Sequence, residues 1–301
     1  MTEFLQFLLK GISVGSLYAL LALGYTMVYG ILQFINFAHS DVFMLGAFFS
    51  WRLATWFKLI DPSPLVATSL LLAAMALCAL TGFLIELLAY RPLRRAPRLN
   101  VLITAIGVSL FLENSGQLVF GKDPRSYPQL LAEHTFSVGG VNVRSVEVIA
   151  VVTALALMVA LHTLVYRTKI GRAMRAVSID HKVAGLMGIP VSRVISFTFV
   201  VGSALAAAAG VLVGITYGQI KQPADSSWVL YGLKAFVAAV IGGIGSVPGA
   251  MLGGLLIGLC EQFVGGYIST QLRDAIIFAL LIVVLLVKPS GLLGRRAIEK
   301  I

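Results

Sequence analysis

The stretch from Val194 to Tyr217 reads VISFTFVVGSALAAAAGVLVGITY and contains no charged residue. A helix needs roughly 20 mostly apolar residues to cross the hydrocarbon core of a bilayer. This stretch meets that length without a proline, so it predicts a membrane-spanning α-helix.

The rest of the 301-residue chain has the same character. Hydrophobic residues make up 58% of it and charged residues 12%, and the mean hydropathy is +0.94. A soluble domain carries about a quarter charged residues, so this chain has too little polar surface to face water on every side. We expect a single membrane domain over residues 1–301, because no hydrophilic stretch is long enough to form a separate soluble domain.

Other apolar stretches predict further crossings. They are Phe4–Tyr29, Val42–Phe57, Pro64–Tyr90, Val101–Phe120, Val146–Tyr166 and the long stretch Val229–Val287. The last is interrupted by glycines on either side of Pro248 and again near Gly265, so it forms three crossings, or one crossing and a re-entrant hairpin. The predicted fold is an all-α, polytopic helical bundle with about eight to nine crossings, some of them broken or re-entrant.

Most of the basic residues gather in three connectors, which set the orientation. They are Arg91, Arg94, Arg95 and Arg98; then Arg167, Lys169, Arg172, Arg175, Lys182 and Arg193; and finally Lys288, Arg295, Arg296 and Lys300. Basic residues close to span ends stay on the cytoplasmic side. We therefore expect a cytoplasmic C-terminus, an external loop Gly121–Arg144 and an external N-terminus. The net charge of +10 is a topology signal with some affinity for anionic membrane lipid, and it does not indicate a nucleic-acid interface.

The second basic connector, about residues 167–193, contains a short amphipathic pattern. From Arg175 to Met187 apolar residues recur at helical spacing, and Gly188 and Pro190 then supply a stop. The residues concerned are Arg175, Ala176, Ile179, Val183, Ala184, Leu186, Met187 and Gly188. The apolar face of such a helix has to be buried against another apolar surface. Two alternatives stay open: a helix on the membrane interface, or a coupling helix that docks on a cytoplasmic ATPase.

A second segment places polar side chains between two apolar runs. Asn36, His39, Ser40 and Asp41 lie there. Ionisable residues at membrane depth are candidates for a substrate pathway. Asn36 and Ser40 can equally cap the following helix, with Asp41 in its first turn.

Two further candidates for the pathway come from other stretches. Glu113 and Asn114 lie well inside an apolar run, where a structural hydrogen bond between helices is the alternative role. Gly242, Gly243 and Gly245 allow a break in the long last stretch, and broken helices often mark the substrate path of transporters.

Catalytic chemistry is not indicated. The histidines and the two cysteines, Cys78 and Cys260, have no metal-ligand spacing. The glycine-rich segment is not followed by Gly-Lys-Ser or Gly-Lys-Thr, so it is no phosphate loop and the chain itself should not bind ATP. We expect no enzyme activity, no metal and no cofactor.

Several motifs together resemble the permeases of branched-chain amino-acid importers. They are Gly15–Leu20 with Leu23-Gly24, Asn36–Ala47, Arg91–Arg94 with Thr104–Gly107, Gly171–Ala176, Ile241–Gly249 and Lys288–Gly294. The similarity runs from end to end, and the chain is similar to the shorter of the two permeases in such systems. It departs from the family at Ser40, where glycine is usual, and in its cytoplasmic helix, which keeps only Ala184 and Gly188 of the docking motif.

The resemblance implies a multi-pass subunit of the bacterial inner membrane. It implies a heterodimer with a second permease, two cytoplasmic ATPase subunits and an external substrate-binding protein, and translocation of branched-chain or other aliphatic amino acids by alternating access. The alternative is a secondary transporter of small polar solutes driven by an ion gradient, with Asp41 or Glu113 as the ion site.

Overall fold

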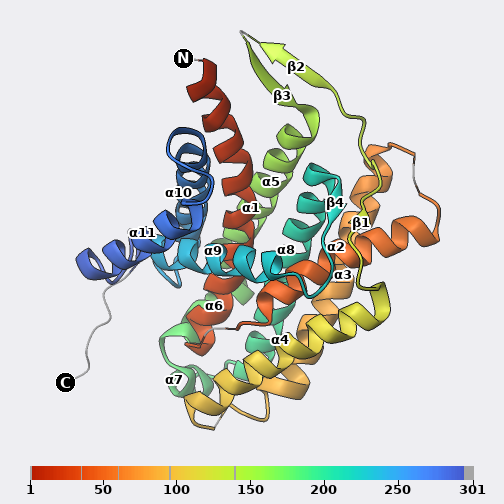
Figure 1. Cartoon of the computed structure of the whole chain (residues 1–301). Coiled ribbons are helices and arrows are strands. Elements are labelled where there is room, and N and C mark those ends of the chain that lie inside the picture. Colours follow the sequence, from red (N-terminus) through yellow and green to blue (C-terminus); the bar gives the residue numbers. More distant parts are fainter. Residues whose placement is uncertain (1, 35, 60, 95, 139, 295–301) are drawn as a thin grey trace.

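The computed structural model describes residues 2–34, 36–59, 61–94, 96–138 and 140–294, most of which are helical (Figure 1). The α-helices are α1 (Thr2–Leu32), α2 (His39–Trp56), α3 (Pro64–Ile85), α4 (Arg98–Phe120), α5 (Ser145–Arg167), α6 (Lys169–Ile179), α7 (His181–Leu186), α8 (Val191–Tyr217), α9 (Ser226–Gly242), α10 (Val247–Tyr267) and α11 (Arg273–Val287). A π-helical turn, η1 (Glu86–Tyr90), continues α3. The predicted all-α class is confirmed. The predicted roles of Arg95, Arg295, Arg296 and Lys300 in the basic connectors fall outside the described residues.

The predicted apolar stretches correspond closely to these helices. Within the described residues, six helices are long and apolar enough to cross a membrane: α1, α3 with η1, α4, α5, α8 and α10. Three shorter helices account for the other predicted crossings: α2 with 18 residues, α9 with 17 and α11 with 15. The long last stretch forms three separate helices, α9, α10 and α11. Helix α9 runs across the upright α1 and α10 (Figure 1), as expected for a broken or re-entrant segment.

The core forms around α1 and α8, whose central residues are almost all buried. Small residues let the neighbouring helices approach closely. A Cβ atom on Gly210 of α8 would lie 2.1 Å from the carbonyl oxygen of Phe43 on α2, and one on Gly258 of α10 would lie 2.2 Å from the Cα of Gly15 on α1. Close backbone approach through small residues is the usual basis of helix packing in membranes.

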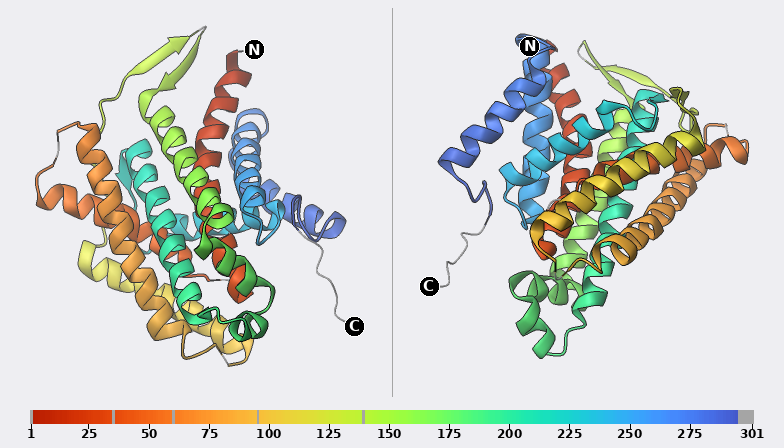
Figure 2. Two further views of the ribbon diagram at one scale, coloured as in Figure 1. Left: turned by 180° about the vertical axis from the view of Figure 1, so that it is seen from behind. Right: turned by 60° about the horizontal axis from the view of Figure 1, so that its bottom comes forward.

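The loop predicted to be external contains strands that sequence periodicity did not indicate. Strands β2 (Thr135–Val138) and β3 (Val141–Arg144) form an antiparallel hairpin, and β1 (Arg125–Ser126) pairs with β4 (Gln219–Ile220) between α8 and α9. The hairpin lies at one end of the molecule, beside the start of α1, and α6 and α7 lie at the other end (Figures 1 and 2). The two ends of the molecule are therefore built from different elements.

Candidate translocation and coupling site

The turn between α1 and α2 brings the predicted polar residues together inside the bundle. Asn36, His39, Ser40 and Asp41 are all buried. The Tyr90 hydroxyl donates a hydrogen bond of 2.7 Å to Asn36 Oδ1, and the Ser109 hydroxyl donates one of 2.5 Å to Asp41 Oδ2. These contacts join the start of α2 to η1 and α4.

Of the two roles predicted for Asn36 and Ser40, the structure does not form the helix cap. Helix α2 begins at His39, and its N-cap, Ala38, provides no side-chain hydrogen bond. The Ser40 hydroxyl donates back to the Phe37 carbonyl oxygen at 2.9 Å, and the Asn36 amide oxygen is occupied by Tyr90. Asp41 lies in the first turn of α2, as predicted.

Two buried polar atoms in this turn lack a partner among the described residues. They are His39 Nε2 and Asp41 Oδ1. The His39 ring packs edge-on against Tyr25, with ring centroids 4.6 Å apart. An unsatisfied buried polar group costs roughly 1–3 kcal/mol, so such groups persist where they serve a purpose or meet water. The turn therefore stays a candidate for the pathway.

The structure does not place Glu113 and Asn114 deep in the core. Asn114 is exposed, and its Nδ2 donates to the Leu110 carbonyl oxygen of its own helix at 2.7 Å. Glu113 is half-buried and lies one turn after Ser109, the partner of Asp41, so the two share a face of α4. Within the part of the chain that the structure describes, this hydrogen bond of Asn114 stays inside α4 and does not reach another helix.

The glycine segment forms the turn between α9 and α10. Gly243 and Gly245 have φ angles of 105° and 87°, which only glycine adopts without strain. The closing segment of the chain covers this turn, because Leu292 N–H and Leu293 N–H donate to the carbonyl oxygens of Ile241 and Gly242 at 2.8 and 2.9 Å. Gly242 and Gly243 therefore lie against the chain's own tail, and Gly245 lines a small cavity beside α6.

The amphipathic segment is two helices, and the prediction of one continuous helix from Arg175 to Met187 is wrong. Asp180 ends α6, and its carboxylate accepts hydrogen bonds from Lys182 N–H and Val183 N–H at 2.8 and 3.1 Å. This is an N-cap for α7. The cap competes with helix continuation, so the apolar residues on either side of Asp180 belong to different helices.

These two helices present apolar side chains to the outside. The exposed fractions are 80% for Ile179, 54% for Val183, 88% for Leu186 and 78% for Met187. We call these four residues the exposed apolar surface. Ala184 is buried, Ala176 and Arg175 are half-buried, and Gly188 follows α7 with a φ angle of 81°.

Helix α6 is attached firmly to the bundle. Arg175 Nη1 donates to the Val165 carbonyl oxygen of α5 at 2.6 Å, and its guanidinium lies 5.2 Å from the centre of the Tyr166 ring. Arg175 also lines the cavity of about 50 Å³ that contains Gly245 and Gly30. A displacement of α6 would therefore reach α5, α1 and the turn before α10.

Comparison with known proteins identifies the family. A family model described as "Branched-chain amino acid transport system / permease component" matches residues 7–285. The chain belongs to this permease family. It is 44% identical to the high-affinity branched-chain amino acid transport system permease protein LivH of Salmonella typhimurium, over 99% of this chain and 98% of the relative. It is 43% identical to the permease protein BraD of Pseudomonas aeruginosa, with the same coverage, and 27% identical to a probable LivH of Methanocaldococcus jannaschii, over 96% of this chain and 92% of that protein.

No solved structure matches the chain. The spanning helices and the family membership together make it a multi-pass transport permease. The resemblance drawn from the sequence motifs is confirmed.

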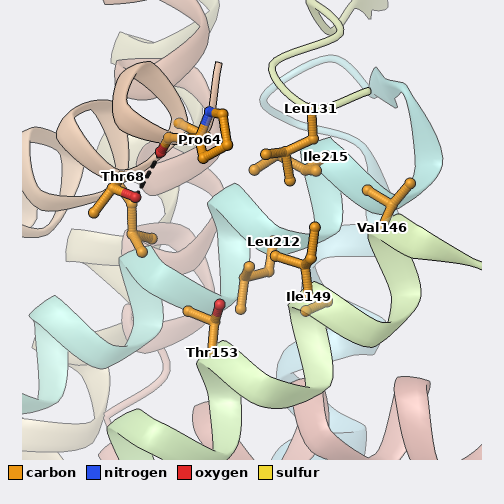
Figure 3. A pocket seen from close by; sticks show the side chains of 11 residues that line it. Pro64, Thr68, Leu131, Val146, Ile149, Thr153, Leu212 and Ile215 are labelled. Atoms are coloured by element: carbon orange, nitrogen blue, oxygen red, sulfur yellow. Dashed lines mark hydrogen bonds between the residues drawn. The ribbon is translucent and has the colours of Figure 1, made fainter. Parts of the chain in front are cut away.

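One cavity of the permease is unsuited to a charged solute. About 210 Å³ of space opens between α3, α5 and α8, where Ile149, Leu212 and Ile215 point toward one another (Figure 3). Thr68 is among its few polar residues, and its hydroxyl donates to the Pro64 carbonyl oxygen at 2.7 Å. None of the lining residues is charged, so the crevice offers mainly hydrocarbon contacts.

Sequence reasoning missed a buried charged cluster in the permease. Lys234 Nζ of α9 donates to Glu261 Oε1 of α10 at 2.8 Å and to Asp274 Oδ1 of α11 at 2.7 Å. The Tyr18 hydroxyl of α1 donates to Glu261 Oε2 at 2.6 Å. Lys234 and Glu261 are 7% and 8% exposed. The cluster connects α1, α9, α10 and α11. In the sequence it was indicated only by two isolated residues of opposite charge, Lys234 and Glu261, within apolar stretches.

A second cluster fixes the first basic connector. Glu86 is fully buried and accepts hydrogen bonds from Arg91 at 3.0 Å, from Arg94, and from the Ser196 hydroxyl of α8 at 2.7 Å. The π-helical turn makes this possible by bringing residues five apart onto the same side. Although Glu86 lies near the end of a span, its carboxylate is held inside the protein and does not reach toward water.

Proposed function

We propose that this permease is one half of the translocation unit of an ATP-binding-cassette importer. It would carry branched-chain or other aliphatic amino acids across the bacterial inner membrane by alternating access. Its partners would be a second permease, two cytoplasmic ATPase subunits and an external substrate-binding protein. The family of the chain and the printed transport role of its relatives support the substrate class.

The observation that carries the proposal is the exposed apolar surface on α6 and α7. Apolar side chains exposed in a group mark an interaction site. The surface lies at the end of the molecule opposite the β2–β3 hairpin (Figure 2), in the connector whose basic residues favour the cytoplasm. The sequence contains no phosphate loop, which supports our inference that ATP is hydrolysed by a separate subunit that docks here.

Movement of α6 gives the docked ATPase a route to the pathway. The Arg175 contact with Val165 and the shared cavity with Gly245 support this coupling. We infer that Asn36, His39, Ser40 and Asp41 line or shape the path, and that the Gly242–Gly245 turn lets α9 and α10 change their angle. Glu113 lies beside this path on α4.

One observation favours the alternative, an ion-driven secondary transporter. Asp41 is fully buried and its Oδ1 has no hydrogen-bond partner among the described residues, as expected for a carboxylate that binds a proton or sodium ion. Under the importer hypothesis Asp41→Asn keeps most of the uptake, because an amide can still accept from Ser109. A complete loss of uptake in this variant, together with loss of uptake on adding an uncoupler at unchanged cellular ATP, would favour the alternative.

The orientation is tested by labelling single cysteines in whole cells. Gln129 lies in the loop predicted to be external, and His181 lies at the start of α7; both are exposed. In a Cys260→Ala background, we expect an impermeant thiol reagent to label Gln129→Cys and to leave His181→Cys unlabelled until the cells are opened. Labelling of position 181 in intact cells would reverse the orientation.

The partners are tested by purification of the tagged permease from native membranes. We expect a second permease and two ATPase subunits for each copy of this chain. A tagged permease that carries out uptake after purification without any ATPase would contradict the proposal.

A further inference from the structure

A second cavity of the permease has mixed chemistry. A cavity of about 170 Å³ is lined by residues from the end of α8, strand β4 and the start of α9. Val213 and Tyr217 of α8 form one wall, Trp228 and Tyr231 of α9 another, and Lys221 and Ser227 lie at its polar side. Unlike the crevice between α3, α5 and α8, this cavity offers contacts to both a charged group and a hydrocarbon chain of a ligand.

The aromatic wall is held in place before any ligand arrives. Trp228 Nε1 donates to the Gln222 carbonyl oxygen at 2.9 Å, and its ring packs edge-on against Phe43 with centroids 5.4 Å apart. The centre of the Tyr231 ring lies 5.8 Å from the centre of the Tyr18 ring, and the Tyr18 hydroxyl is hydrogen-bonded to Glu261 in the charged cluster. Fixed walls lower the ordering cost of binding a ligand.

The polar side of the cavity holds one positive charge, Lys221, and the carboxylate of Asp225 lies beside this lysine, outside the residues that line the cavity. Lys221 Nζ donates to Ser227 Oγ at 2.9 Å and lies 3.8 Å from Asp225 Oδ1. Asp225 is fixed because its carboxylate caps α9 by accepting from Ser227 N–H at 2.9 Å. The Ser227 hydroxyl accepts from Lys221 and keeps its own hydrogen for another acceptor.

We propose that this cavity is a binding subsite for one free aliphatic amino acid. The α-carboxylate would bind Lys221 and the Ser227 hydroxyl, the α-ammonium group would approach Asp225, and the aliphatic side chain would pack on Val213 and Trp228. The inference rests on the proposed import function and gives it a specific place between α8 and α9.

The test uses the assembled complex in proteoliposomes, with leucine-loaded binding protein outside and ATP inside. Initial leucine uptake is expected to fall about tenfold or more in Lys221→Gln and in Ser227→Ala, because each removes a hydrogen bond to a charged group. Lys221→Arg keeps the charge and should retain most of the uptake. Lys122→Gln, an exposed lysine in the connector after α4, is the control and should match the unaltered complex.

Two results would overturn the subsite. One is leucine uptake within about twofold of the unaltered complex in Lys221→Gln, Ser227→Ala and Asp225→Asn, since about 1.4 kcal/mol of lost binding already gives tenfold. The other is an equal loss in Lys122→Gln, which would indicate an effect of surface charge alone. If Lys221→Gln does not assemble with its partners, the leucine uptake of Ser227→Ala decides instead, and uptake within about twofold of the unaltered complex overturns the subsite. An unaltered complex that takes up no leucine or other aliphatic amino acid contradicts the import function itself.

Discussion

Replacing Leu186 and Met187 together by aspartate is expected to release the ATPase subunits and to reduce uptake to background. Leu186 ends α7 and Met187 follows it, and both side chains are largely exposed. Burying an apolar side chain of this size contributes about 1.5–3 kcal/mol, and two carboxylates would meet an apolar groove in its place. The measurement is co-purification of the ATPase subunits with the tagged permease, followed by uptake in the same preparation.

The matched control exchanges the two residues, Leu186→Met with Met187→Leu, and so keeps the apolar surface. It should retain both the partners and the uptake. Because α7 lies outside the predicted spans, the aspartate variant should still insert and fold, which its yield in the membrane reports. A helix that only rests on the membrane interface predicts the opposite: the ATPase subunits stay bound to the aspartate variant. Full uptake with both partners present would rule out the coupling role of α7.

Lys234→Met is expected to destabilise the permease by about 3–5 kcal/mol, because removal of one partner leaves a buried charge uncompensated. Glu261 is 8% exposed and has Lys234 and Tyr18 as its partners. Asp274 would also lose its contact with α9. The measurement is thermal unfolding in detergent, where Lys234→Met should unfold at a much lower temperature than the unaltered chain.

The pair Lys234→Met with Glu261→Gln should recover a large part of this loss, because it removes both main charges. Lys10→Met on the exposed side of α1 is the control for removal of a lysine and should change stability by less than about 1 kcal/mol. If Lys234→Met unfolds at the same temperature as Lys10→Met, the cluster does not stabilise the bundle.

The helices could be predicted from the sequence because their signal is local. A run such as Val194–Tyr217 has to satisfy its backbone internally in lipid, and a helix does so whatever lies beside it. The partners of buried charges are not local. Glu261 lies 27 residues beyond Lys234, and nothing in either apolar run indicates that the two meet.

Asp180 shows a different limit of prediction from the sequence. Its preference for an N-cap was present in the sequence, yet the apolar period continued past it and suggested a single helix. In the structure the cap is formed, so α6 ends at Ile179 and α7 begins at His181. For the turn at Asn36–Asp41, local chemistry suggested caps, whereas Tyr90 and Ser109 from other helices provide the partners.

Leucine uptake by the reconstituted complex, with sodium and proton gradients collapsed, tests the importer proposal most directly. The complex contains the permease, its partner permease, the two ATPase subunits and the external binding protein. We predict uptake that requires ATP inside, stops with a non-hydrolysable analogue, and continues without any ion gradient. Uptake that proceeds without ATP and disappears when the gradients are collapsed would contradict it.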